Sequence, residues 1–134
     1  MPIIYSEERD LSAHDFRHIL LASTLSERRP VDDLDRLERM LRHADLIITA
    51  RDGTRLVGVS RAITDFSYCC YLSDLAVDVT YQRQGIGKRL IDETRVRAGE
   101  SATLLLVSAP AAEAYYPKIG MKQVTACWSI PRKN

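Results

Sequence analysis

The chain has 134 residues and a mass of 15.2 kDa, which is the size of one compact domain. Hydrophobic residues make up 46% of it and charged residues 28%, with only 6 Gly and 5 Pro, so the composition excludes a disordered or fibrous chain. The formal net charge of +1 excludes the strong electrostatic field that attracts nucleic acid or an anionic membrane. We therefore expect a single domain over residues 1–134 with no nucleic-acid partner.

The cell compartment is predicted from apolar runs and cysteines. The longest aliphatic run is 104–107, far shorter than the roughly 18 to 20 residues that span a bilayer. Charges begin at Glu7, which leaves no room for the apolar part of a signal peptide. Cys69 and Cys70 are adjacent and point to opposite faces of a predicted strand, which favours reduced thiols, and no cysteine pair has zinc-ligand spacing. These observations predict a cytoplasmic protein with no membrane partner and no metal.

The first part of the chain is predicted to contain one short strand and two helices. Residues 3–5 predict the strand, and Ser12 with Asp15 three residues later is typical of a helix start. Residues 25–30 break this helix, and 32–44 predict a second one. The acids of the second helix precede its arginines in i,i+4 pairs, so we interpret its arginine stripe as a solvated face.

An antiparallel meander is predicted next. The strands 46–51 and 54–63 flank an Asp-Gly pair at 52–53, which tolerates the positive φ angles of a type I′ turn. Residues 68–79 are rich in aromatic and branched side chains and predict the third strand of the meander.

The remaining elements complete a mixed α/β pattern. A helical period runs from Gln84 to a stop at Gly99. The apolar run 103–107 predicts a strand, which we expect to be central. A short helix is predicted over 111–119 and a last strand over 124–130.

One segment between a predicted strand and a predicted helix has the features of an anion site. It is Gln82-Arg83-Gln84-Gly85-Ile86-Gly87-Lys88. Its glycines let the backbone approach a ligand closely, and the free N–H groups and positive dipole end of a helix start favour phosphate. A glycine-rich turn without a ligand explains the two glycines equally well. The spacing excludes a Walker loop, and Leu90 stands where a dinucleotide fingerprint needs a third glycine.

The chain resembles the GNAT superfamily of N-acetyltransferases at three places in the right order. The pyrophosphate motif of that family is Gln or Arg, two residues, Gly, one residue, then Gly or Ala, and 82–87 fits it. A Leu-Ala-Val sequence precedes the motif at 75–77. The segment 112–121, with its Tyr-Tyr-Pro-Lys-Ile-Gly sequence, is similar to a later helix of the family. The resemblance covers nearly the whole chain.

This resemblance implies a central, mostly antiparallel sheet flanked by helices and splayed between the strands around Leu75 and Leu105, with acetyl-CoA as co-substrate in the gap. Backbone groups of Leu75, Ala76 and Val77 would pair with the pantetheine arm. The pyrophosphate would be held by the segment described above, whose residues are Gln82, Arg83, Gln84, Gly85, Ile86, Gly87 and Lys88.

The resemblance also implies that Tyr116 lies near the sulfur as general acid. An amine that attacks a thioester builds negative charge on the departing sulfur, which needs a proton. A tyrosine with an ordinary pKa of about 10 stays protonated at neutral pH and can protonate a thiolate, whose pKa is about 8.5. Without the resemblance, core packing would explain Tyr115 and Tyr116 better.

Three carboxylates near the predicted cleft could serve as general base: Asp65, Asp74 and Glu113. We choose Asp74 because relatives often place polar or acidic residues that contact substrate just before the part of the strand that binds the cofactor. Strict alternation puts Asp74 on the face opposite Tyr71 and Ser73, so a bulge would be needed to re-aim it. A solvated or capping aspartate, or an ordered water that carries the proton, explains the sequence as well.

The acceptor side is predicted from two places. Tyr71 and Ser73 precede the strand segment that binds the cofactor, and Arg28 and Arg29 join the first two helices, a region that often lines the acceptor side in relatives. The arginines could recruit an acidic group of the substrate, although a surface turn explains them too. The asparagine that often precedes the later helix in the family is missing, with Pro110 in that region.

We therefore predict an N-acetyltransferase that moves the acetyl group of acetyl-CoA to a primary amine by direct transfer in a ternary complex. The acceptor would be a small-molecule amine or a protein amine. A non-catalytic acyl-CoA sensor is the alternative. The sequence leaves the acceptor and the choice between a monomer and a homodimer open.

Overall fold

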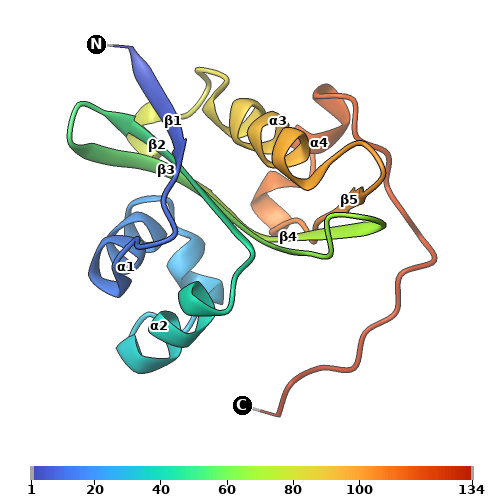
Figure 1. Cartoon of the computed structure of the whole chain (residues 1–134), viewed down its shortest axis with the longest axis horizontal. Helices are drawn as coiled ribbons and strands as arrows, with labels where there is room; N and C mark the ends of the chain where they lie inside the picture. The colour runs from blue at the N-terminus through green and yellow to red at the C-terminus, as the bar shows by residue number, and fades with distance from the viewer. Residues whose placement is uncertain (1, 134) are drawn as a thin grey trace.

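A five-stranded sheet in the order β1-β2-β3-β4-β5 forms the centre of the computed structural model, which describes residues 2–133 (Figure 1). The strands are β1 (Ile3–Glu7), β2 (Leu46–Asp52), β3 (Arg55–Thr64), β4 (Cys69–Val77) and β5 (Thr103–Leu105). The first four are antiparallel neighbours, and β5 pairs with β4 in parallel. This confirms the predicted mixed α/β fold with a mostly antiparallel sheet. Met1 and Asn134, which the predicted domain includes, lie outside the described residues.

Helices lie on both faces of the sheet. The longer ones are α1 (Ala13–Ala22), α2 (Leu34–Arg42) and α3 (Ile86–Ala98), and the short ones are η1 (Leu25–Arg28), η2 (Val79–Tyr81), η3 (Pro110–Ala112) and α4 (Tyr115–Lys118). The helices α1 and α2 cover one face, and α3 covers the other (Figure 1). The sheet is therefore the middle layer of three.

The helix starts follow from their capping residues. Ser12 Oγ accepts a hydrogen bond from the backbone N–H of Asp15 at 3.1 Å, as the sequence predicts. Asp33 Oδ1 accepts one from the N–H of Arg36 at 3.0 Å, so α2 begins two residues later than the predicted start at residue 32. On the surface of α2 the predicted pair of Glu38 and Arg42 forms at 2.8 Å.

Three apolar clusters hold the layers together, the smallest of them around Cys70 and Ala98. Phe16 and Leu37 belong to the cluster between α1, α2 and the sheet, and Val57 and Leu90 belong to the one under α3. Gly58 in β3 allows α3 to come close, because a Cβ there would lie 3.0 Å from Leu90 Cδ1.

The hairpin between β2 and β3 differs from the prediction in its turn type. Asp52 pairs with Arg55, so the two loop residues are Gly53 and Thr54, one position later than predicted. Gly53 has φ 63°, and Thr54 is not among the residues with positive φ. A type I′ turn needs positive φ at both central residues, so the predicted type is wrong, and a glycine first in the loop is typical of type II′.

The C-terminal third departs furthest from the predicted elements. The apolar run 103–107 forms only the three residues of β5, at the edge of the sheet and not at its centre. The predicted helix 111–119 is two short turns, η3 and α4. The predicted strand 124–130 is not a strand: the segment runs out along one side of the molecule (Figure 1), with Trp128 93% and Ile130 98% exposed.

The adjacent cysteines point to opposite faces of a strand, as predicted. Cys69 is exposed and Cys70 buried, on opposite faces of β4, and both are free thiols, as is Cys127. Within residues 2–133, no helix combines the length and the apolar character needed to cross a membrane.

Candidate functional site

The unpaired edge of β4 is the first element of the candidate site. The parallel ladder to β5 covers only Cys69, Cys70 and Tyr71, whereas the antiparallel ladder to β3 continues to Val77. The strands β4 and β5 therefore separate beyond Tyr71. Along Leu75, Ala76 and Val77, the side of the strand away from β3 has no strand partner among the described residues. An extended ligand could pair with this edge as an added strand does.

The turn that follows β4 exposes the start of α3. Gln82 lies in this turn, and its side-chain amide donates a hydrogen bond to the carbonyl of Val77 at 3.1 Å. Arg83 and Gly85 both have positive φ, 66° and 81°, which folds the backbone sharply before Ile86. The N-cap residue Gly85 supplies no side-chain cap, so the N–H groups of Ile86 and Gly87 are left for a ligand, whereas that of Lys88 meets the Tyr115 hydroxyl.

The charges around this turn favour an anion. No acidic residue lies in the first turn of α3. Lys88 forms an exposed pair with Asp92 at 2.9 Å, which weakly offsets its charge. Arg83 is exposed and, among the described residues, forms no ion pair. Together with Gln84 the segment 82–88 therefore forms the positive, uncapped helix start that the sequence predicts.

Two tyrosines of α4 approach this region. The Tyr115 hydroxyl lies 3.0 Å from the position that a Cβ on Gly87 would occupy, so a larger residue at 87 would push against it. Burial raises the pKa of Tyr115, and a hydrogen bond from the Lys88 backbone works in the opposite direction. The rings of Tyr115 and Tyr116 meet edge to face, with centroids 5.3 Å apart.

Tyr116 lines a large cavity. This cavity has a volume of about 1030 Å³ and lies between α3, β5, α4 and the segment that follows α4. Lys88 and Glu113 also line it. Burial raises the pKa of Tyr116, so its hydroxyl keeps its proton at neutral pH. Of the three carboxylates considered as base, Glu113 lines this cavity, whereas Asp65 accepts backbone hydrogen bonds in the turn between β3 and β4.

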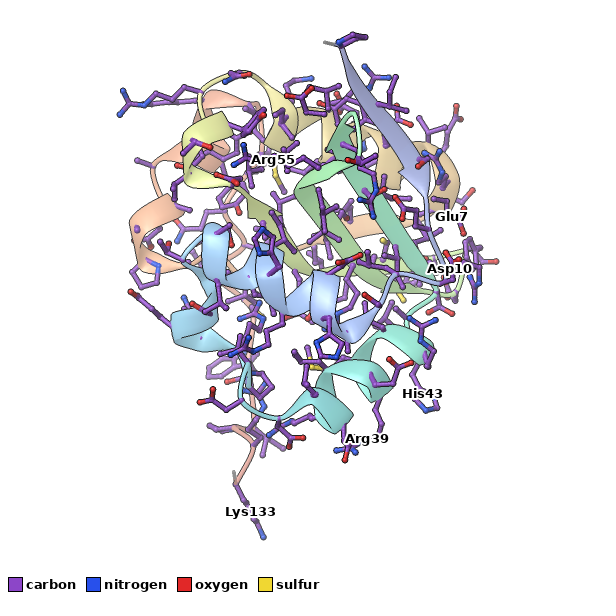
Figure 2. All side chains as sticks on the ribbon, turned by 90° about the vertical axis from the view of Figure 1, so that its left-hand side faces the viewer. Glu7, Asp10, Arg39, His43, Arg55 and Lys133 are labelled. Atoms are coloured by element: carbon purple, nitrogen blue, oxygen red, sulfur yellow. The ribbon has the colours of Figure 1, made fainter. Side chains whose placement is uncertain are left out.

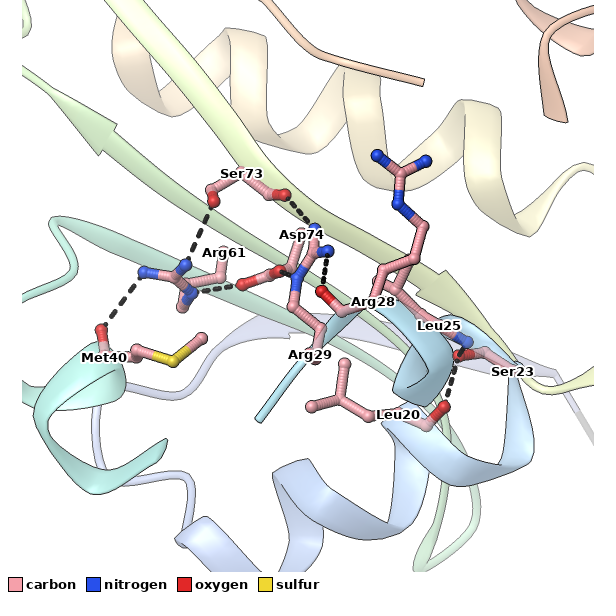
Figure 3. A network of polar contacts seen from close by, with 9 residues as sticks. All are labelled: Leu20, Ser23, Leu25, Arg28, Arg29, Met40, Arg61, Ser73 and Asp74. Atoms are coloured by element: carbon pink, nitrogen blue, oxygen red, sulfur yellow. Dashed lines mark hydrogen bonds and ion pairs between the residues drawn. The ribbon is translucent and has the colours of Figure 1, made fainter. Parts of the chain in front are cut away.

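Asp74 lies at the centre of a buried polar cluster (Figure 3). Its side chain is 0% exposed, and its two carboxylate oxygens accept hydrogen bonds from the Nε atoms of Arg29 and Arg61. Arg29 also donates to the carbonyls of Ser73 and Arg28, both at 2.8 Å. Arg61 donates to Ser73 Oγ at 3.1 Å and to the carbonyl of Met40 at 3.3 Å.

This environment opposes a role of Asp74 as general base. An amine cannot reach a carboxylate that is fully buried and has both oxygens occupied by guanidinium groups. A bulge of the kind that could re-aim Asp74 is present, because Arg61 pairs with Asp74 and Ala62 pairs with Leu72, which leaves Ser73 as the extra residue. It does not turn Asp74 toward either cavity. The carboxylate instead holds Arg29 and Arg61 in place.

The structure brings the four residues predicted on the acceptor side together. Tyr71, Ser73, Arg28 and Arg29 all line a second cavity, with a volume of about 820 Å³, beside the point where β4 and β5 separate. Val107 lines both cavities, so the two adjoin there. The proposed general acid and the acceptor residues therefore face neighbouring spaces.

Two residues near the candidate site were not assigned to it from the sequence. Arg61 had a signal: it is a charge in the apolar interior of the strand 54–63, next to a strand that contains the acid Asp74. Tyr115 had none beyond its position beside Tyr116, because its contact with the start of α3 depends on how α4 lies in space. Among residues 2–133, no group of three or more His, Cys, Asp or Glu residues is arranged to hold a metal ion.

The chain matches a family model over most of its length. The model describes an acetyltransferase (GNAT) domain, and it matches residues 23–127. A curated protein, an uncharacterized N-acetyltransferase of Porphyra purpurea, is 28% identical over 93 residues. That match covers 65% of this chain and 53% of the relative, so the chain spans about half the length of the curated relative.

Solved structures share the fold along nearly the whole chain. A GNAT family acetyltransferase from Streptococcus pneumoniae TIGR4 is similar with a TM-score of 0.78 and 24% identity, covering 99% of this chain and 98% of that one. A Staphylococcus aureus protein of unknown function gives a TM-score of 0.81 at 20% identity, covering 99% and 100%. An aminoglycoside acetyltransferase from an uncultured soil metagenomic sample, in complex with sisomicin, gives 0.68 at 20% identity, covering 97% of each chain.

Proposed function

Because the chain belongs to the GNAT acetyltransferase family, we propose that it transfers the acetyl group of acetyl-CoA to a primary amine by direct attack in a ternary complex. The observation that carries this proposal is the uncapped start of α3 directly after the unpaired edge of β4. A pyrophosphate needs N–H donors and positive charge, which the start of α3 offers, and a pantetheine arm needs free backbone groups, which the edge of β4 offers. The two features are neighbours, as the pyrophosphate and the pantetheine arm are in acetyl-CoA.

The binding roles follow from these features. Leu75, Ala76 and Val77 offer backbone groups to the pantetheine arm, for which the Gln82 side chain has to release the Val77 carbonyl. The backbone N–H groups of residues 83–88 hold the pyrophosphate, with Arg83 and Lys88 adding charge.

The reaction needs one proton removed and one supplied. The amine nitrogen attacks the carbonyl carbon, the new C–N bond forms, and the C–S bond breaks with its electron pair on sulfur. Tyr116 donates its hydroxyl proton to that sulfur and regains a proton from solvent. Since Asp74 is buried and paired, we assign the removal of the amine proton to water and not to that side chain.

The test is release of free CoA thiol from acetyl-CoA in the presence of a panel of amines. Tyr116→Phe removes only the hydroxyl, and we expect it to lower kcat by about 10²-fold or more at unchanged affinity for acetyl-CoA. Tyr68→Phe, on an exposed turn residue, is the matched control and keeps full activity. Binding of acetyl-CoA without turnover of any amine, with Tyr116→Phe indistinguishable from wild type, would favour the acyl-CoA sensor instead.

The role of water has its own test. Of the three carboxylates considered as base, Glu113 is the one that lines the cavity of Tyr116, so Glu113→Gln tests whether it, rather than water, takes the amine proton. We expect kcat/KM of this variant to stay within about twofold of wild type at neutral pH. A loss of about 10²-fold or more would identify Glu113 as the base and contradict the proposed route.

A further inference from the structure

The second cavity is strongly cationic. The basic residues that line it are Arg28, Arg29, Arg36, Arg61, Arg132 and Lys133. Glu27 is the one carboxylate among its described lining residues. The whole chain has a net charge of only +1, so positive charge is concentrated at this place. Lys133 reaches it from the C-terminal segment, which ends below α1 and α2 in Figure 2.

The buried cluster next to the cavity keeps an excess positive charge. Asp74 is paired with both Arg29 and Arg61, so one carboxylate is shared by two guanidinium groups. The other two guanidinium nitrogens of each arginine donate hydrogen bonds to backbone or serine oxygens, which fixes the position of both side chains. The cluster is therefore a rigid cationic wall and not a set of flexible surface charges.

Arg28 differs from these two arginines. It is exposed, and its guanidinium points away from Asp74 in Figure 3. Its Nη1 donates one long hydrogen bond, 3.4 Å, to the carbonyl of Ser108, and it forms no ion pair with any residue in the described part of the chain. Arg28 thus carries a planar set of donors that suits a carboxylate or phosphate.

The second cavity lies beside the proposed positions of the pantetheine arm and the general acid, where an acceptor amine would have to bind. Tyr71 is the last residue of β4 that pairs with β5, and Ser73 follows it just before the segment proposed to hold the pantetheine arm. Val107 separates this cavity from the one that Tyr116 lines. An amine that enters past Arg28 would therefore approach the space in front of the Tyr116 hydroxyl.

We infer that the acceptor is an amine whose far end carries an oxyanion, a carboxylate or a phosphate, that the Arg28 guanidinium binds against the Arg29–Asp74–Arg61 wall. This inference rests on the proposed acetyl transfer and adds the chemical class of the acceptor. A cationic far end, as in a diamine, would be repelled by the same wall.

Matched amines test the inference by steady-state release of CoA thiol. Butylamine, putrescine and γ-aminobutyrate form one set, with neutral, cationic and carboxylate far ends; ethanolamine and phosphoethanolamine form the phosphate set. We expect kcat/KM of at least one anionic amine to exceed that of its matched partners by about tenfold or more, with the preference falling as salt rises. Equal rates, a preference for putrescine, or no turnover of either anionic amine overturns the inference.

A single substitution tests whether Arg28 causes the preference for anionic amines. Arg28→Gln should raise KM for the preferred anionic amine by about tenfold with little change in kcat, leave butylamine unaffected, and leave the affinity for acetyl-CoA unchanged. Arg39→Gln, on an exposed arginine of α2 that does not line the cavity, is the control and keeps the preference. An equal loss for butylamine and the anionic amine would contradict the role of Arg28.

The two proposals fail in different ways. If butylamine or putrescine is acetylated and the anionic amines are not, the inference falls and acetyl transfer stands. If titration calorimetry detects no binding of acetyl-CoA, both fall together.

Discussion

Residues 11–98 and residues 99–133 are built in different ways. Every buried residue of the described chain lies in the first region, between Leu11 and Ala98, and the second region has none. The proposed pyrophosphate site belongs to the first region, whereas Tyr116 belongs to the second. Stability and part of the proposed chemistry are therefore separated along the chain, because apolar burial is the main stabilising contribution to a fold.

The second region adds only two partly buried side chains, Ala102 and Leu104, to a core cluster of the first region. The apolar residues of 103–107 line the larger cavity, and Leu105 and Val107 remain 46% and 62% exposed. A ligand in this cavity would cover these side chains, so binding and local order are coupled here. The comparison between the two regions leads to four predictions on stability.

The largest effect is expected for the buried charge cluster of the first region. Asp74→Asn leaves Arg29 and Arg61 without their shared counter-charge, and we expect the free energy of unfolding to fall by about 3–5 kcal/mol. Urea unfolding followed by circular dichroism measures this. Arg39→Gln serves as the control for a lost surface charge. A loss below about 1 kcal/mol for Asp74→Asn would show that the cluster is not a structural unit.

The same substitution made in both regions compares them directly. Leu90→Ala removes a fully buried side chain under α3, and we expect a loss of about 2–4 kcal/mol. Leu105→Ala, in the half-exposed strand β5, should cost less than about 1 kcal/mol. The shifts of the urea midpoints of the two variants, relative to wild type, give the ratio of the two losses of stability. Equal losses would mean that the second region has a core of its own.

Removal of the C-terminal segment also tests whether the second region contributes little to stability, and the expected change is smaller. A chain that ends at Gln123 loses no buried residue, so its free energy of unfolding should change by less than about 0.5 kcal/mol. Arg132 and Lys133 are lost with the segment, so the preference for anionic amines should weaken. A large loss of stability would instead support the strand that the sequence predicts over 124–130.

The smallest effect is expected at the turn between β3 and β4. The carboxylate of Asp65 accepts hydrogen bonds from the backbone N–H groups of Ser67, Tyr68 and Cys69, which lower its pKa from 3.8 to about 2. A carboxyl with a lowered pKa stabilises the fold above its ordinary pKa and loses this contribution as pH falls through the folded value. Asp65→Asn should therefore melt below wild type at pH 7, and the difference should shrink as pH falls and vanish only below about pH 2. A difference that is constant with pH would exclude the carboxylate charge as its source.

The sequence predicts the first region well because its signals are local. Ser12 caps α1, and a glycine-rich turn between strand and helix predicts the start of α3. The burial and pairing of Asp74 do not follow from its neighbours in sequence. They depend on Arg29 and Arg61, which come from other elements and meet the carboxylate only after the sheet forms.

The second region is predicted poorly for a related reason. Alternating apolar residues at 124–130 indicate a strand only if a sheet edge is present to cover one face, and β5 is three residues long. The apolar run 103–107 was expected at the centre of the sheet because central strands are apolar, but here the same residues form a cavity wall. Composition does not distinguish these two uses of apolar side chains.

Titration calorimetry with acetyl-CoA and with S-acetylpantetheine tests the central claim most directly. The two thioesters share the arm that β4 would pair with, and only the first carries the pyrophosphate proposed to lie at the start of α3. We predict clear heat and a raised Tm with acetyl-CoA, and binding at least about tenfold weaker with S-acetylpantetheine. Equal affinity for the two compounds, or no heat with acetyl-CoA at millimolar concentration, would contradict the account.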